Sequence, residues 1–351
     1  MKLSDFDYSL PEELIAQYPS NARGDDRLLV LDRAKNSFRE RVFADIADYF
    51  KEGDLLVLND TKVIPARLFA RRKTGANVEI FIIDKTKNPV EALVRPSGRI
   101  KENESVILDS GDEARVLGSA EIGRLVEFNR PVEEILERYG HVPLPPYITR
   151  RDEPGDKKRY QTIYAKEEGA TASPTAGLHF TEDLIDKLKK KGVELAYITL
   201  HVNYGTFAPV KEEIVERHEM HSEFYHISEE NASIINKARK RCAKIFACGT
   251  TSLRALETYA DSRAHLNADS SRAHLSVPYC CSVSGFTNLF IYPGFKFKMA
   301  NVLITNFHLP KSTLILLTSA FAGKDLLFKA YRYAIEKSFR FFSYGDAMLI
   351  I

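Results

Sequence analysis

The sequence lacks several features that define whole classes of protein. It has no run of about 18 apolar residues, so we expect no membrane span. Residues 1–5 carry no apolar signal core, and we therefore expect the protein to stay in the cytoplasm. Only four of the 351 residues are cysteine and none forms a C-x-x-C pair, so we expect reduced cysteines that bind no metal.

Familiar ligand-binding motifs are also missing. No Gly-Lys-Thr/Ser follows a glycine at P-loop spacing, and the glycine-rich loop of most α/β methyltransferases is absent. His218 and His221 are three residues apart, whereas the zincin helix places its histidines four apart, so we expect no metal there. The net charge of +2 is small, so any nucleic acid must bind a local basic patch.

What the sequence does contain is an alternation of apolar runs of strand length with helical segments. We expect strands at 28–31, 55–58, 193–202, 244–248, 302–305 and 348–351. We expect helices at 9–18, directly after the capping residues Thr181 and Ser228, and at 253–259, 312–320 and 325–338. This alternation predicts an α/β main domain with a mixed or parallel sheet.

Between residues 63 and 129 the pattern changes to short β-rich runs separated by turn residues. The runs cover 77–83, 90–94, 105–108, 114–117 and 125–128. Strands this short and closely spaced predict a small antiparallel β-barrel domain. We therefore expect a discontinuous catalytic domain, residues 1–60 and 150–351, with a barrel inserted at 61–149.

The segment 169–181 has no large apolar residue before Leu178, so it fits neither a core strand nor an amphipathic helix. Its hydroxyl side chains, Thr171, Ser173 and Thr175, offer hydrogen bonds without bulk. His179 adds a group that exchanges protons near neutral pH. We interpret the segment as the wall of a ligand pocket, although a flexible linker has a similar composition.

A second candidate site is the turn between the strand at 244–248 and the next helix. It consists of Gly249, Thr250, Thr251 and Ser252. Backbone N–H groups at the start of a helix attract a phosphate or carboxylate. An ordinary strand-to-helix turn is an equally good interpretation of so short a motif.

Two further histidines follow predicted strands, where open α/β sheets bind ligands. His201 ends one strand and is followed by Tyr204 and Phe207, and His308 comes two residues after Asn306 at the end of another. Single histidines at such positions are often structural. Together with His179 they make three histidines in loops, and three favour a shared site.

Basic residues cluster in three places along the chain. They are Arg71, Arg72, Lys73, Arg150, Arg151, Lys157, Lys158 and Arg159. If these loops converge they form a footprint for a phosphate backbone, and Tyr160 and Tyr164 lie beside the last cluster for stacking on bases. A solvated protein surface is the alternative.

Taken together, many segments resemble the S-adenosylmethionine:tRNA ribosyltransferase-isomerase family of queuosine biosynthesis. The resemblance is carried by residues 10–16, 58–68, 140–148, 160–165, 169–181, 249–257, 305–313 and 340–348. The chain departs from the family pattern at Ala208, where we expect Arg, and at Phe286 and Asn288, where Trp and Asp are common. A short repeat at 262–275 is also foreign to the family, and we expect it to form a surface loop.

The resemblance implies transfer and isomerisation of the ribosyl group of S-adenosylmethionine onto 7-aminomethyl-7-deazaguanine in the anticodon loop of tRNA. It implies no metal and no cofactor beyond S-adenosylmethionine as co-substrate, and we expect a monomer. A catalytically inactive tRNA-binding protein and an S-adenosylmethionine-dependent methyltransferase are the alternatives.

The chemistry of this reaction agrees with the candidate residues. A sulfonium acidifies the neighbouring C5′ proton, so an imidazole with a pKa of about 6.5 is a suitable base. We expect His179 and His201, with His308 as a third candidate, to share the proton transfers. The expected substrate-binding residues are Thr171, Ser173, Thr175, Tyr204, Phe207, Gly249, Thr250, Thr251, Ser252, Asn306 and Asp346.

Overall fold

The computed structural model describes the chain except residues 86–87, 121, 203–209, 211 and 269–281. Its main domain is built on a nine-stranded sheet with the order β15-β13-β12-β3-β14-β16-β17-β1-β2. In that order the strands are Val283–Thr287, Glu223–Ile227, Glu194–Leu200, Leu55–Asn59, Ile245–Cys248, Val302–Asn306, Ala347–Ile350, Arg27–Asp32 and Ser37–Val42. The predicted α/β sheet is therefore confirmed.

The sheet is mixed. β12, β3, β14 and β16 run parallel, as do β17 and β1, whereas β16 and β17 are antiparallel. The remaining neighbours, at both edges, are also antiparallel. The central strands β3 and β14 are buried along their whole length, which is why their sequences are continuous apolar runs and not alternating ones.

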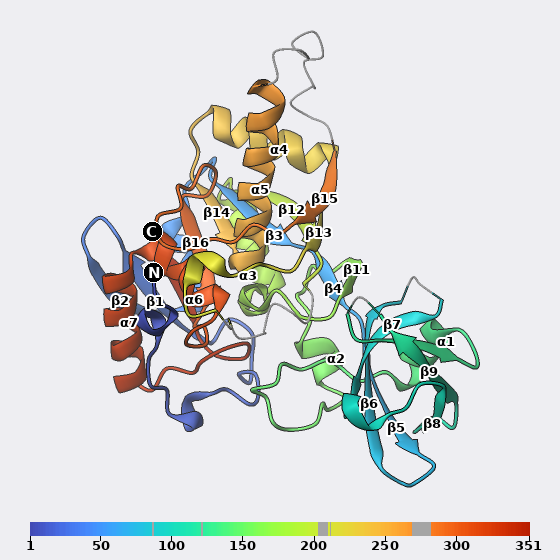
Figure 1. Ribbon diagram of the computed structural model, residues 1–351. Helices are drawn as coiled ribbons and strands as arrows, with labels where there is room; N and C mark the ends of the chain where they lie inside the picture. Colours follow the sequence, from blue (N-terminus) through green and yellow to red (C-terminus); the bar gives the residue numbers. More distant parts are fainter. Residues whose placement is uncertain (86–87, 121, 203–209, 211, 269–281) are drawn as a thin grey trace.

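Helices cover both faces of this sheet (Figure 1). One face packs on α4 (Glu229–Lys240), α5 (Gly249–Ala268), α6 (Thr313–Ala322) and α7 (Lys324–Glu336). The other packs on α3 (Glu182–Lys190) and on the 3-10 helices Phe43–Tyr49 and Thr175–His179. The expected caps form, since the side chains of Thr181 and Ser228 accept from Leu184 N and Asn231 N.

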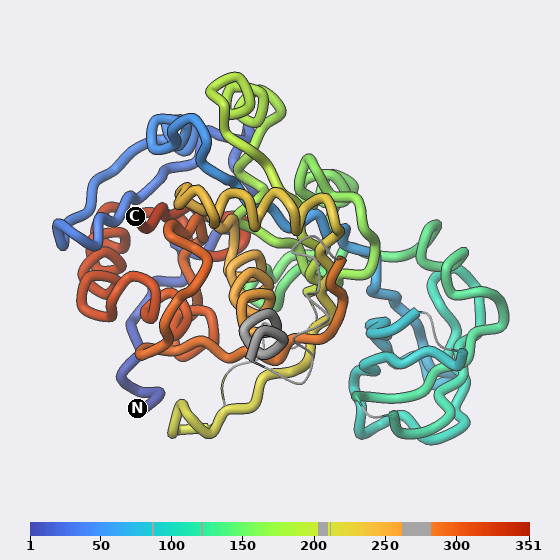
Figure 2. The backbone as a smooth tube through the Cα atoms, turned by 90° about the horizontal axis from the view of Figure 1, so that it is seen from above, coloured from blue at the N-terminus to red at the C-terminus, as the bar shows by residue number. Residues whose placement is uncertain are grey.

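The second body is a closed six-stranded barrel that lies beside the main domain in Figures 1 and 2. Its order is β10 (Arg124–Phe128), β7 (Val90–Arg95), β6 (Asn77–Asp84), β5 (Arg67–Arg72), β8 (Glu104–Leu108) and β9 (Glu113–Ser119), all antiparallel. Helix α1 (Val132–Tyr139) follows it. The barrel is thus confirmed, and β5 is a strand that the sequence patterns did not reveal.

Short elements connect the two bodies. Strand β4 (Thr61–Val63) pairs in parallel with β11 (Glu167–Ala170), and helix α2 (Asp156–Arg159) lies near the junction. A cavity of about 590 Å³ at this junction is lined by Lys62, Lys85, Lys157 and Glu168, among others. In the described part of the chain, no helix is both long and apolar enough to cross a membrane.

Two local predictions were wrong. Residues 9–18 contain only the 3-10 turn Glu12–Leu14, because Phe341 N binds Leu14 O at 2.8 Å and Ala16 N binds Phe341 O at 3.2 Å. These tertiary bonds replace the helical ones. Helix α5 also starts at Gly249 and continues to Ala268, so the first copy of the repeat begins within a helix and not in a loop.

Candidate active site

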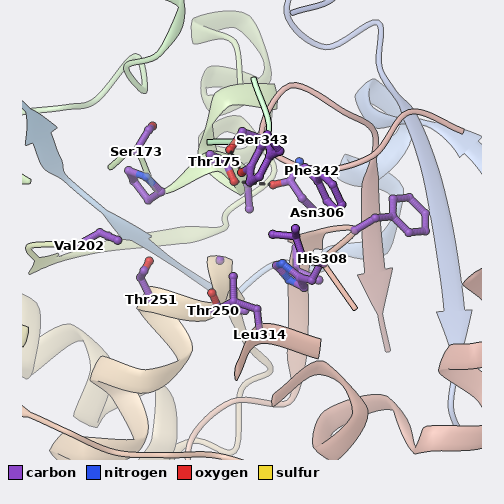
Figure 3. Close-up of a pocket in the computed structure, with 17 residues that line it drawn as sticks. Ser173, Thr175, Val202, Thr250, Thr251, Asn306, His308, Leu314, Phe342 and Ser343 are labelled. Atoms are coloured by element: carbon purple, nitrogen blue, oxygen red, sulfur yellow. Dashed lines mark hydrogen bonds between the residues drawn. The ribbon is translucent and has the colours of Figure 1, made fainter. Parts of the chain in front are cut away.

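A small cavity lies at the carboxyl ends of the parallel strands, where open α/β sheets bind ligands (Figure 3). It brings together two segments with predicted substrate-binding residues, 173–176 and the start of α5, and adds Asn306 and His308 from the end of β16. Its volume is about 50 Å³. Ligand pockets usually start at about 300 Å³, so a nucleoside-sized ligand must displace part of the lining.

The first turn of α5 forms one wall of the cavity. Gly249 has φ +90°, which lets the chain pass from β14 into the helix without a linker. Thr250 and Thr251 line the cavity, while the Ser252 hydroxyl donates to Cys248 O at 2.7 Å and is fully buried. The positive end of a 20-residue helix therefore faces the cavity, which favours an anionic group there.

Hydroxyl side chains of the segment 169–181 lie on the opposite wall of the cavity. Thr175 donates to Asn306 Oδ1 at 3.0 Å, the bond drawn in Figure 3. The Ser173 hydroxyl is buried and has no partner among the described residues, so it is free to bind a ligand. Thr171 binds Val202 O through its backbone and its hydroxyl and supports the segment from behind.

His179 is bonded at both ring nitrogens. Nδ1 lies 2.7 Å from Asp26 Oδ2, and Nε2 lies 3.0 Å from Asn306 Nδ2. Burial alone raises the pKa of Asp26, but the hydrogen bond and charge of His179 lower it below its usual value. An ionised Asp26 holds the proton on Nδ1, so Nε2 accepts from Asn306. His179 thus reaches the cavity only through Asn306.

His308 lines the cavity itself. Its Nε2 lies 2.7 Å from Thr305 Oγ1, and its backbone binds the hydroxyls of Tyr331 and Tyr8. Burial lowers the pKa of His308 to about 3. The ring is therefore neutral at physiological pH, which suits a hydrogen-bonding role better than proton transfer.

His201 packs against Gly169 and does not line the cavity. Its Nδ1 is 2.8 Å from Thr61 Oγ1, and in the described part of the chain its Nε2 has no hydrogen-bond partner. Burial lowers the pKa of His201, and the charge of Glu167 opposes this shift. A neutral imidazole with one free nitrogen is the form a general base needs.

The carboxylate of Asp346 is bound by backbone N–H groups. It accepts from Arg27 N at 2.9 Å and from Arg340 N at 2.7 Å, and burial raises its pKa. The residue thus joins β1 to the segment before β17, and its carbonyl receives Asn306 Nδ2 at 3.4 Å. Tyr204, Phe207 and Ala208 lie outside the described residues.

The predicted basic residues divide into two groups. Arg72 pairs with Glu104, Arg150 binds both carboxylate oxygens of Asp156, and Arg159 donates to the carbonyls of Ser20 and Asn21, so these three serve the fold. The exposed ones are Arg71, Lys73, Arg151, Lys157 and Lys158. Tyr160 is fully buried, so it does not offer a face to a base.

Several site residues were missed by sequence reasoning. Asn59 Nδ2 donates to Leu200 O and to Thr251 Oγ1, which ties β3 to β12 and α5. Tyr147 binds Ser343 Oγ at 2.6 Å, and both line the cavity with Phe342. The polar run that follows β3 was the signal for Asn59, whereas nothing local marked the other three.

Arg254 was also missed. It forms a buried ion pair with Glu223, and its Nη2 atom has no partner among the described residues. With Thr250 and Thr251 it lines an adjoining space of about 10 Å³, on the far side of the two threonines. That volume holds about one water-sized atom.

Metal ligands are not grouped in this part of the chain. Among the described residues, no three His, Cys, Asp or Glu side chains lie together in a way that could hold a metal ion. Cys242 is exposed and Cys248 is buried, and burial raises the pKa of Cys248 to about 12. Cys280 and Cys281 lie outside the described residues.

The sheet, the inserted barrel and the polar cavity at the strand ends define a ligand-binding α/β protein with an inserted β-barrel. Comparison with known families narrows this class. The chain belongs to the family described as "Queuosine biosynthesis protein", which matches residues 3–350. The resemblance inferred from the sequence is therefore confirmed.

Relatives match the chain over its whole length. It is 50% identical to the S-adenosylmethionine:tRNA ribosyltransferase-isomerase of Caldanaerobacter subterraneus subsp. tengcongensis, with 100% of both chains covered. It is 48% identical, with the same coverage, to the protein of that name from Sulfurihydrogenibium sp.. A crystal structure of S-adenosylmethionine tRNA ribosyltransferase from Thermotoga maritima has a TM-score of 0.55 and 38% identity, covering 99% of this chain and 100% of that one.

Proposed function

We propose that this protein transfers and isomerises the ribosyl group of S-adenosylmethionine onto the 7-aminomethyl-7-deazaguanine base of tRNA, with release of adenine and methionine. The product carries epoxyqueuosine. Family membership supports the reaction. The observation that carries the assignment of a site is the cavity shared by residues 173–176, the start of α5 and Asn306.

In this proposal, S-adenosylmethionine occupies the cavity after part of its lining moves. The carboxylate of its methionine part binds the first turn of α5, where the helix dipole and free N–H groups favour an anion. Ser173 and Thr250 supply hydrogen bonds. Asn306 is held by Thr175 and His179 and presents a fixed amide to the ligand.

We assign the removal of the C5′ proton to His201, whose ring does not line the cavity, so S-adenosylmethionine must extend past the displaced lining to reach it. The sulfonium makes this proton acidic, and a neutral imidazole with a free Nε2 accepts it. His179 and His308 were expected to share proton transfer. Both ring nitrogens of His179 are hydrogen-bonded, and burial lowers the pKa of His308 to about 3. In the proposal these two histidines therefore position Asn306 and the cavity wall.

We also propose that the protein acts as a monomer in the cytoplasm, on the anticodon loop of tRNA, with no cofactor beyond S-adenosylmethionine as co-substrate. The bond from C5′ to the sulfonium breaks with methionine as the leaving group, so the chemistry requires no redox cofactor.

The test is an incubation with S-adenosylmethionine and tRNA that carries the precursor base, followed by analysis of the small products. Free adenine with methionine is the expected outcome. S-adenosylhomocysteine would instead indicate a methyltransferase. Binding of tRNA without either product would indicate a protein that has lost catalysis.

A further inference from the structure

Strands β12, β13 and β15 align six side chains in two rows on one face. Thr199 lies opposite His226, and His226 opposite Ser284. Two residues along, Phe224 lies opposite Phe286, and His201 N binds Phe224 O at 3.0 Å. Because residues directly opposite in antiparallel strands share a face, His201, Phe224 and Phe286 form one aromatic row.

The rings of this row are in contact. The centroids of His201 and Phe224 are 5.6 Å apart, with the rings stacked at 24°. Those of Phe224 and Phe286 are 5.8 Å apart in an edge arrangement at 71°. The row therefore runs without interruption from the His201 imidazole to β15, the edge strand of the sheet.

Phe286 is exposed to an unusual degree. Its exposed fraction is 70%, the highest among the large apolar residues that the structure describes, the next being Tyr18 at 51%. The opposite face of these strands packs on α4 and α5, so the aromatic row lies on the face turned away from these helices. Because this exposed ring continues a row of contacting rings, it offers a surface on which a planar ligand can stack.

The second row supplies polar groups next to the rings. His226 Nδ1 lies 2.6 Å from Ser284 Oγ, and Thr199 Oγ1 donates to Asp60 at 2.7 Å. Rings beside hydrogen-bonding groups on a sheet face suit an unstacked RNA base, which stacks by its face and is bound by its edge. A protein partner would instead require a wider apolar patch, of several hundred Å².

We propose that Phe286 and Phe224 form a stacking platform for a tRNA base that neighbours the reacting nucleotide. This inference rests on the proposed function. The outer strands of the trio are about 10 Å apart, so a base on Phe286 and a base at His201 belong to adjacent nucleotides. The platform binds tRNA and makes no contact with S-adenosylmethionine.

Phe286→Ala and Phe286→Trp test the platform. Val42→Ala is the matched control, since Val42 is an exposed apolar residue on β2, the opposite edge strand of the same sheet. Stacking on one aromatic ring is worth about 5- to 150-fold in affinity. Phe286→Ala should raise the Kd for tRNA by that factor. Phe286→Trp and Val42→Ala should keep the Kd of the wild type. The KM for S-adenosylmethionine and the Tm should stay constant in all three.

A second readout locates the base. tRNA with 2-aminopurine next to the reacting nucleotide should change its fluorescence on binding to the wild type and to Phe286→Trp, but not to Phe286→Ala. A tRNA Kd within twofold of wild type in Phe286→Ala would overturn the platform. So would a dimer that Phe286→Ala dissociates without any change in tRNA binding. Failure of the wild type to release adenine would instead overturn the proposed function itself.

Discussion

The imidazole of His201 lies against the backbone of Gly169. A Cβ at residue 169 would be 2.8 Å from Nε2 and 2.9 Å from both neighbouring carbons of the ring. No real side chain tolerates such contacts, so either the ring or the segment must shift. The glycine at the start of the pocket segment therefore determines where the proposed base can lie.

Gly169→Ala should lower kcat for adenine release on the order of 100-fold, because a shift of about 1 Å in a reacting group has that effect. Gly169 also has φ +148°, so strain alone is a possible cause. Gly294→Ala separates the two effects, since Gly294 has φ +106° and nothing within 4 Å of its Cβ position. Equal losses of kcat in both variants would contradict steric displacement of His201.

Variants of His201 and His179 should differ in whether they lower activity or stability. His201→Gln should lower kcat by about 100-fold or more, the range expected for loss of a general base, and leave the free energy of unfolding nearly unchanged. His179→Gln should lower the free energy of unfolding by about 1–3 kcal/mol, because it disrupts the partners of buried Asp26 and Asn306. Urea unfolding and single-turnover rates on both variants measure this. The reverse pattern would transfer the base role to His179.

The lowered pKa of His308 predicts that the free energy of unfolding depends on pH. Its pKa is about 3 in the folded protein and about 6.5 in the unfolded chain, so between these values the unfolded state binds more protons. Stability should therefore fall as the pH falls below about 6.5, by about 1.4 kcal/mol per pH unit from this residue.

His308→Gln is the variant that isolates this contribution. Subtracting its unfolding free energy from that of the wild type at each pH removes the carboxylates that both proteins share. The difference should become smaller from pH 7 to pH 4.5. A constant difference would show that His308 binds its proton at the same pH in the folded and unfolded states, so that its pKa is not lowered by folding.

The elements that sequence patterns predicted correctly are those with local signals. α3 and α4 have hydroxyl caps, and β3 and β14 are continuous apolar runs. Strand β5 was missed because half of its residues are arginine, although Leu68 and Ala70 alternate toward the barrel core. Residues 9–18 have helical signals, but their backbone binds Phe341 instead.

In the candidate site, too, only features with a local signal could be predicted from the sequence. The hydroxyl-rich composition of the segment 169–181 predicted Ser173 and Thr175, and positions at strand ends predicted Gly249, Asn306 and His308, all of which line one cavity. Which histidine nitrogens stay free depends on contacts between segments far apart in the chain, such as Asp26 with His179 and Thr61 with His201. No local pattern contains that information.

The division of the basic residues leads to a final prediction about salt. Lys157 and Lys158 are exposed on α2, near the junction with the barrel, whereas Arg150 is occupied by Asp156. If both lysines contact phosphates, the variant with Lys157→Ala and Lys158→Ala should reduce the slope of log K against log salt by about 1.4–1.8. Lys35→Ala is the control, in the turn between β1 and β2 and away from the barrel.

Arg150→Ala should behave differently from the lysine variant. It leaves the buried Asp156 without its bidentate partner, so it should lower the free energy of unfolding by about 3–5 kcal/mol. Its salt slope for tRNA should match that of the wild type, because a guanidinium bound to a carboxylate displaces no counterion from RNA. A slope reduced by Arg150→Ala but not by the lysine variant would mean that tRNA opens this ion pair and contacts the chain through it.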